Sequence, residues 1–381
     1  MKTKKLTFIE AVMLIAGAGI GTGILTIPYA VEQIGIFGTL IALLFAYVVS
    51  ILMYLIIADL TVHSKKSNDL IGILEEHLFK GKSKVVMKIT FFILLILLLI
   101  ENLVVYILCA SNVLTDLLGI PLFTSKIIFY SIASSIIFFG VKGIGIGEKY
   151  SVILIGAIIG LLIIFSFENI QNRLNISFGE PRLIFAIYGL FMFAFSAIFS
   201  IIQVCNHIEN KSEISKAVIL GLSVNAGITL LFSVVTIIGS EKVTEIATIG
   251  LSESLNFSLI KIICSVFVLL AMLSSFWSSG LAFAEVLEQQ TNLSKTVSWF
   301  ISTLPTVIIA IILPLSILDY IQIGAGALSI ILVIVVLPAY YNAVKASDHC
   351  LLGKFAKSKL LISTVAIAIC LMCISSFITI N

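Results

Sequence analysis

The feature that most constrains this chain is a series of long apolar stretches separated by short polar segments. A helix needs about 20 apolar residues to cross a bilayer. Hydropathy predicts eleven such spans, at residues 8–33, 37–61, 86–117, 124–141, 150–167, 183–207, 214–239, 258–286, 296–317, 320–342 and 359–379. Hydrophobic residues make up 60% of the chain and charged residues 11%, against about 45–50% and 25% in soluble domains. This composition excludes a soluble enzyme and a nucleic-acid-binding module, and it predicts a multi-pass protein of the cell membrane.

Basic residues are distributed unevenly between alternate loops. If the N-terminus is cytoplasmic, 18 of the 23 lysines and arginines fall in cytoplasmic segments and five in outer segments. The positive-inside rule therefore predicts a cytoplasmic N-terminus and, with eleven spans, an extracellular C-terminus. Two connecting segments are predicted to have structure of their own: a short amphipathic helix at the cytoplasmic surface within 67–79, and a folded outer loop over 241–256.

The first span contains glycine at every second position from Gly17 to Gly23, followed by Pro28. Each glycine weakens a helix by about 1 kcal/mol relative to alanine. Close helix packing through small-xxx-small faces is one interpretation. A spacing of two, however, places glycines on all sides of a helix, which favours an unwound segment lining a cavity. Its freed N–H groups can bind a carboxylate, and its freed carbonyls can bind a cation or an ammonium group.

Two other spans contain polar residues that suit such a cavity. The sixth span has Ser196 and Ser200 among phenylalanines but no central glycine, so a packed helix and a broken one both remain open. The eighth has Ala271, Ser274 and Ser275 on one helix face. Facing the carbonyls of the first span, they would form an all-oxygen site suited to Na⁺. The alternative, equally open, is that these serines bond only to carbonyls of their own helix.

Glu101 lies near the middle of the third span. A lone carboxyl group is costly there and becomes neutral unless it is paired. A neutral glutamic acid hydrogen-bonded within the bundle is one interpretation, and a proton-carrying group is the other. Cys370 and Cys373 have no partner pair or nearby histidine, so no metal or redox role is expected of them.

The segment 19–30, Gly-Ile-Gly-Thr-Gly-Ile-Leu-Thr-Ile-Pro-Tyr-Ala, resembles the first-helix motif of the amino acid permeases of the amino acid–polyamine–organocation superfamily. The nearest branch is the aromatic/hydroxy amino acid and amino acid/auxin permeases, which the runs 191–196, 209–213, 216–221, 244–250 and 274–276 also resemble. The resemblance covers about residues 8–345. It implies an all-α LeuT-type fold of two inverted five-helix repeats, with helices 1 and 6 broken at the midplane. The ten-helix core would occupy 1–345, with repeats at about 8–167 and 183–342, and 346–381 would add a loop and an eleventh helix.

The resemblance also implies site residues. The substrate carboxylate would be bound by Gly21, Thr22 and Gly23. The amine would be bound by carbonyls near Ala16, Gly17, Phe193 and Ser196. A sodium ion would be bound by the carbonyls of Gly17, Ile20 and Ala271 and the hydroxyls of Ser274 and Ser275. Two departures matter: Ala197 stands where the branch often has glycine, and 151–159 lacks the lysine of some proton-coupled relatives, which favours sodium.

The predicted pocket walls are bulky and apolar, with the aromatic residues Tyr106, Phe193, Phe195, Phe199, Phe276 and Trp277. Not all of them can face one cavity, since Phe193 and Phe195 point to different sides of a regular helix. Glu101 is the one charged residue near the predicted site, so a substrate with a charged side chain would be buried unpaired. A neutral amino acid is therefore expected, with an aromatic or large aliphatic side chain preferred.

The sequence thus predicts a secondary carrier that imports a neutral amino acid by alternating access, with sodium as the coupling ion and no other cofactor. A proton symporter acting through Glu101 is one alternative. A nutrient receptor on the same fold, which binds without net transport, is another. No nucleic-acid partner is expected beside the lipid bilayer, the amino acid and the coupling Na⁺ or H⁺. An enzyme is not expected, because no span carries a nucleophile–base pair or a metal-ligand cluster.

Overall fold

The computed structural model describes residues 5–64, 69–81, 83–168, 170, 175–244, 246–254, 258–313, 331–345, 350–375 and 378. Within these ranges the secondary structure is helical, apart from one isolated bridge between Leu6 and Ile208. The α-helices are α1 (Phe8–Gly19), α2 (Thr22–Ile34), α3 (Ile36–His63), α4 (Leu70–His77), α5 (Lys84–Leu118), α6 (Leu122–Ile137), α7 (Gly140–Glu168), α8 (Pro181–Ala194), α9 (Ile198–His207), α10 (Ile214–Gly239), α11 (Ala247–Ser254), α12 (Ser258–Thr291), α13 (Lys295–Ile312), α15 (Leu337–Lys345) and α16 (Lys359–Ser375). Short turns of other helix types are η1 (Lys211–Glu213), η2 (Leu332–Val336) and η3 (Gly353–Phe355).

Seven helical segments of the described chain are long and apolar enough to cross a membrane, or eight if the bent pair α1–α2 counts as one span. Large apolar side chains such as Leu44, Leu97 and Ile164 face outward on these helices, as lipid contact requires. The prediction of an all-helical membrane protein is confirmed. The count of eleven stays a prediction, because α6 and α16 are shorter apolar helices and the first part of the tenth predicted span lies outside the described residues.

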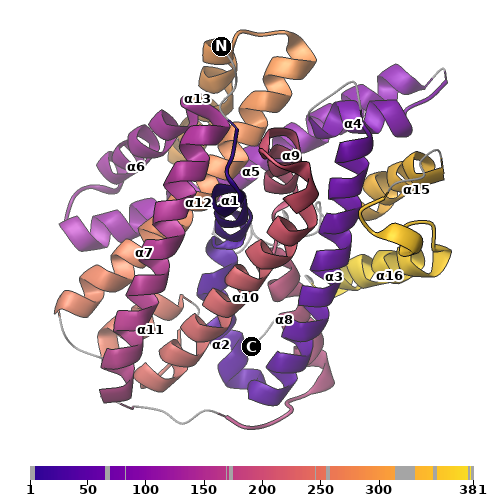
Figure 1. Cartoon of the computed structure of the whole chain (residues 1–381). Helices are drawn as coiled ribbons and strands as arrows, with labels where there is room; N and C mark the ends of the chain where they lie inside the picture. The colour runs from indigo at the N-terminus through magenta and orange to yellow at the C-terminus, as the bar shows by residue number, and fades with distance from the viewer. Residues whose placement is uncertain are drawn as a thin grey trace.

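The helices form two groups by their packing. In one group α1 and α2 pack with α10, and α3 packs with α8, α9 and α10. In the other α5 packs with α6, α12 and α13, and α7 packs with α6 and α12, although α7 also packs closely against α1 and α10 of the first group. Helix α1 lies between the groups, since it also contacts α7 and α12, and Figure 1 shows it surrounded near the centre of the molecule.

The beginning of the first span is fixed by local interactions. Thr7 caps α1 in a capping box, in which the Thr7 N–H donates to Glu10 Oε2 over 2.8 Å and the Thr7 hydroxyl accepts the Glu10 N–H. Lys142 of α7 forms an ion pair with the same Glu10 carboxylate. Leu6 pairs with the end of α9: its N–H donates to His207 O over 2.8 Å, and its carbonyl accepts the Glu209 N–H over 3.0 Å.

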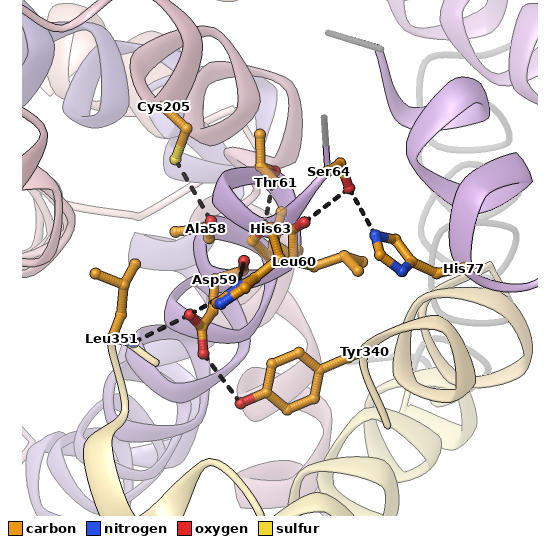
Figure 2. A network of polar contacts seen from close by, with 11 residues as sticks. Ala58, Asp59, Leu60, Thr61, His63, Ser64, His77, Cys205, Tyr340 and Leu351 are labelled. Carbon is orange, nitrogen blue, oxygen red and sulfur yellow. Dashed lines mark hydrogen bonds and ion pairs between the residues drawn. The ribbon is translucent and has the colours of Figure 1, made fainter. Parts of the chain in front are cut away.

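A polar junction holds the chain after the tenth predicted span against the end of α3 (Figure 2). The buried Asp59 carboxylate accepts the Tyr340 hydroxyl over 3.3 Å and the Leu351 N–H over 3.0 Å. Carboxylate, imidazole and thiol ligand atoms of Asp59, His63 and Cys350 lie within 4.8 Å of one another. Because each Asp59 oxygen already accepts a hydrogen bond, we interpret this group as a structural junction. Figure 1 shows the segments that it secures, α15 and α16, at the edge of the molecule beside α3.

Both predicted connecting structures are present. Helix α4 is the amphipathic helix predicted within 67–79. Asp69 caps its N-terminus, and Glu75 on its polar side forms ion pairs with Lys84 and Lys88. Helix α11 lies within the predicted outer loop and packs against α2, α10 and α12. One boundary is wrong: the predicted fifth span begins at 150, whereas α7 begins at Gly140. Hydropathy falls at Glu148 and Lys149, but the helix continues through them.

Candidate functional site

The first span is interrupted at the glycine run. Helix α1 ends at Gly19, α2 begins at Thr22, and their axes differ by 60°. The break frees backbone groups on both sides. The carbonyls of Ala18 and Ile20 each accept the Ser275 hydroxyl at 3.3 Å. At the start of α2 no side chain caps the first N–H groups, which remain available to an anion.

The four glycines permit close approaches on two sides: Gly17 and Gly21 face the neighbouring serines Ser274 and Ser275 of α12, and Gly19 and Gly23 both face Ala194 of α8. A Cβ at Gly17 would collide with the Glu148 carboxylate, and one at Gly19 with the Asn225 amide. A Cβ at Gly21 would come within 2.6 Å of Ser275 Oγ. At Gly23 it would meet Phe193 and Ala194 of α8 at 3.1–3.2 Å. The two interpretations of the run are therefore both correct, since the run is broken at its centre and closely packed at its ends.

A second interruption separates α8 from α9 at Phe195–Ala197, in the middle of the sixth span. The buried Tyr54 of α3 satisfies its backbone on both sides. Its hydroxyl donates to Phe195 O over 2.7 Å and accepts the Ala197 N–H over 2.9 Å. The sixth span is thus broken without a central glycine, because a tyrosine from a neighbouring helix supplies the missing hydrogen bonds.

Asn225 of α10 joins the two interruptions. Its buried amide donates to Ala16 O over 3.3 Å and to Ala194 O over 3.0 Å, and its Oδ1 accepts the Thr229 hydroxyl over 3.1 Å. One side chain therefore fixes the last turn of α1 against the last turn of α8.

A pocket lies where the two interruptions meet. Its lining comes from both broken spans, from α5 and from α12: Ala18, Gly19, Gly21, Thr22, Gly23, Leu98, Asn102, Tyr106, Phe193, Ser196, Ala197, Ile198, Phe199, Ser200, Ser278 and Ser279. The lining combines glycine backbone and serine and threonine hydroxyl groups with aromatic and aliphatic side chains. No charged side chain belongs to this lining. Such a pocket suits a small molecule with a polar end and an apolar body.

The predicted substrate-binding residues are only partly brought together. The pocket is lined by Gly21, Thr22, Gly23, Tyr106, Phe193 and Ser196. Ala16 and Gly17 lie outside the lining, and their carbonyls already accept hydrogen bonds from Asn225 and from the Ile20 N–H. Phe195 is also outside it, stacked on Phe191 with ring centroids 6.3 Å apart.

Of the other predicted wall residues, Phe199 lines the pocket. Phe276 packs edge-on against Phe129, with ring centroids 5.9 Å apart, and Trp277 packs against Gly147. The pocket is therefore less crowded with aromatic rings than the sequence suggests.

The predicted sodium ligands lie below the pocket, on the α1 side of the break. Ser275 bonds the freed carbonyls of Ala18 and Ile20, whereas Ser274 donates to Glu148 Oε2 of α7 over 2.5 Å. Ala271, one turn earlier on α12, is fully buried. The serines therefore bond to other spans, as a shared site requires, rather than only to their own helix.

Glu101 does not line the pocket, although its neighbour Asn102 does. It is half-buried on α5, and its Oε2 has no hydrogen-bond partner among the described residues. Asn102 donates to Leu98 O over 2.9 Å and lies 3.5 Å from the Tyr106 hydroxyl.

Sequence reasoning missed Tyr54, Asn102, Asn225 and Glu148. Glu148 was assigned to a cytoplasmic connection because a charged pair interrupts the hydropathy there. Polar residues within an apolar span are themselves a signal, and it applies to Asn225 and Tyr54. Nothing in the sequence, however, says which backbone groups they bond.

The model of the tryptophan/tyrosine permease family matches residues 3–376. A solved structure of Mhp1, a nucleobase-cation-symport-1 family transporter in a closed conformation with bromovinylhydantoin bound, is similar with a TM-score of 0.68 and 11% identity, over 98% of this chain and 91% of that chain. A structure of MhsT in complex with L-phenylalanine is similar with a TM-score of 0.69 and 15% identity, over 97% and 98%. At these identities the likeness concerns the fold. No curated protein sequence matches the chain.

Proposed function

Because this chain belongs to the tryptophan/tyrosine permease family, and so is an amino acid transporter and not an enzyme, we propose that it imports a neutral amino acid by alternating access. The observation that carries the proposal is the pocket between the two interruptions. Its lining combines open backbone groups of the first span with aromatic side chains, which matches a zwitterion with an apolar side chain.

The substrate carboxylate binds at the start of α2. Thr22 and Gly23 place their N–H groups at the positive end of that helix, and both residues line the pocket. Gly23→Val should abolish substrate binding, because even a Cβ there already touches Phe193 and Ala194. Normal transport by an inserted, folded Gly23→Val variant would place the site elsewhere.

The side chain of the substrate binds among Tyr106, Phe193 and Phe199. Stacking on such rings contributes about 0.5–1.5 kcal/mol beyond burial, so aromatic or large aliphatic amino acids should be preferred. Charged amino acids should be poor substrates, since the lining has no opposite charge to pair with them.

The test is counterflow in proteoliposomes, in which unlabelled tryptophan, leucine, alanine, arginine and glutamate compete with a labelled substrate. Tryptophan or leucine should compete best. Strong competition by arginine or glutamate would contradict a neutral substrate, and stronger competition by alanine than by tryptophan would contradict the aromatic preference alone.

Sodium is the coupling ion of this proposal. Support comes from the oxygen atoms on the α12 side of the break, where Ser275 already contacts two freed carbonyls and Ser274 is one residue away. Ser275→Ala should raise the sodium concentration for half-maximal uptake at least tenfold, which is about 1.4 kcal/mol. Uptake that ignores sodium but follows an imposed pH gradient would contradict this, and Glu101→Gln would then be expected to block net uptake.

The transport movement is a rotation of one helix group against the other. The group of α1, α2, α3, α8, α9 and α10 packs internally, and so does the group of α5, α6, α7, α12 and α13. Substrate and ion bind between them, as in inverted-repeat carriers. The distribution of basic residues supports a cytoplasmic N-terminus and an extracellular C-terminus.

A further inference from the structure

One carboxyl group in the centre of the molecule has no role in the function described so far. Glu148 of α7 is fully buried. Its Oε2 accepts the Ser274 hydroxyl over 2.5 Å, and its Oε1 has no hydrogen-bond partner among the described residues. No lysine, arginine or histidine in the described part of the chain forms an ion pair with it. The adjacent Lys149 lies over the Tyr150 ring instead.

The position of this carboxylate is informative. It lies directly against the end of α1, where a Cβ on Gly17 would collide with both Glu148 and Ser274. Three residues further on are the freed carbonyl of Ile20 and the hydroxyl of Ser275 that bonds it. Helix α7 contacts both α1 and α12, so all these oxygens are held by three packed helices.

The chemistry of this oxygen set favours a small hard cation. Hydroxyl, carbonyl and carboxylate oxygens are the ligands that such ions prefer. A cation bound by neutral oxygens alone leaves a net positive charge in the membrane interior, and an unpaired carboxylate leaves a negative one. When the cation and the carboxylate lie together, each reduces the free-energy cost of burying the other. A bound cation would therefore account for a buried acid without an ion pair beside the break.

We propose that Glu148 supplies the anionic ligand of the coupling-cation site, binding Na⁺ together with the Ser274 hydroxyl and the carbonyls freed at the break of the first span. The proposal rests on the sodium coupling proposed above and adds a third helix, α7, to the ligand set. A movement of α7 relative to α1 would separate the carboxylate from the carbonyls and release the ion.

The test is sodium binding to the purified full-length protein, measured with ²²Na⁺ and by tryptophan fluorescence at constant ionic strength. The chain has two tryptophans, and Trp277 packs on Gly147 beside Glu148, so Trp299→Phe leaves one reporter near the site. Glu148→Gln keeps the shape of the side chain and removes its charge. Glu285→Gln is the matched control, a half-buried carboxyl about three turns along α12 from Ser274 that accepts a hydrogen bond from Gln203.

We expect Glu148→Gln to weaken sodium binding at least tenfold, Glu148→Asp to weaken it less, and Glu285→Gln to leave it within twofold of the parent. Thermal unfolding and size-exclusion profiles check that each variant is folded, and if Glu148→Gln does not fold, Glu148→Asp carries the comparison. If the parent binds sodium and neither Glu148 variant differs from it, this inference is wrong and sodium coupling stands. If the parent protein itself binds no sodium, both this inference and the proposed sodium coupling are wrong.

Discussion

Asn225 and Tyr54 are the two residues on which the interrupted spans most depend. Each supplies hydrogen bonds that a broken helix can no longer make for itself, in a region without water. Asn225 serves the ends of α1 and α8, and Tyr54 serves the gap between α8 and α9. Loss of either should leave buried backbone groups unsatisfied, and the two losses should have different consequences.

Asn225→Asp should destabilise the protein by about 1–3 kcal/mol. The change keeps the size of the side chain but replaces the donor to Ala16 O and Ala194 O by a further acceptor. Thermal unfolding in detergent measures the effect. The matched control is Asn342→Asp, an exposed amide that donates to His77 O. Equal unfolding temperatures for the two variants would contradict the prediction.

Tyr54→Phe should mainly weaken substrate binding. The lost hydroxyl bonds Phe195 and Ala197, which flank the pocket residue Ser196. We expect a several-fold to tenfold rise in the substrate concentration for half-maximal uptake, equivalent to at most about 1.4 kcal/mol. Tyr47→Phe is the control, because the Tyr47 ring also packs on Phe195, whereas its hydroxyl bonds Ser223 of α10 and not the backbone of the gap. A larger effect for Tyr47→Phe would show that the gap is not what positions the site.

At the scale of the elements, sequence reasoning was most successful where a local pattern is sufficient. Alternating glycines predicted the break in the first span, because backbone conformation is decided within a few residues. The break in the sixth span could not be decided, because its cause is Tyr54 on another helix. The start of α7 was misplaced for a related reason: Glu148 has the hydropathy of a loop residue, and only the packing of α7 against α1 and α12 buries it.

Helix α4 should respond to pH through His77. Burial lowers the pKa of His77, although the nearby Glu76 opposes this. The folded position of α4, in which His77 Nε2 lies 3.0 Å from the Ser64 hydroxyl, thus favours the neutral imidazole ring. The contribution of neutral His77 to the stability of this helix is present above the ordinary histidine pKa of about 6.5. It is lost as the pH falls through the lowered pKa that His77 has in the folded protein.

Hydrogen exchange over residues 69–79, corrected for intrinsic rates, measures this effect at about pH 7.5 and about pH 5.5. We expect faster exchange at the lower pH. In His77→Gln the difference between the two conditions should disappear. A pH difference that persists in His77→Gln would assign it to another group.

At the scale of the whole molecule, the arrangement in the membrane is a prediction from the distribution of basic residues, and it has a direct test. Lys80 follows α4 and Lys242 precedes α11, and both side chains are exposed. The predicted topology places Lys80 inside and Lys242 outside. In a background without exposed cysteines, a membrane-impermeant maleimide applied to intact cells should label Lys242→Cys and not Lys80→Cys. The opposite labelling would invert the topology and make the proposed import an export.

The backbone pairing of Leu6 with His207 and Glu209 has a consequence for where the inner gate can open. It ties together the start of α1 and the end of α9, which the predicted topology places at the cytoplasmic face, so α1 cannot swing away without either taking α9 along or breaking two hydrogen bonds. At this end α1 also packs against α10, and it is attached to α7 through the ion pair between Lys142 and Glu10. A side-chain pair separates and re-forms more readily than a backbone pairing, so the exit path to the cytoplasm should open along the seam between α1 and α7, on the same side as Glu148.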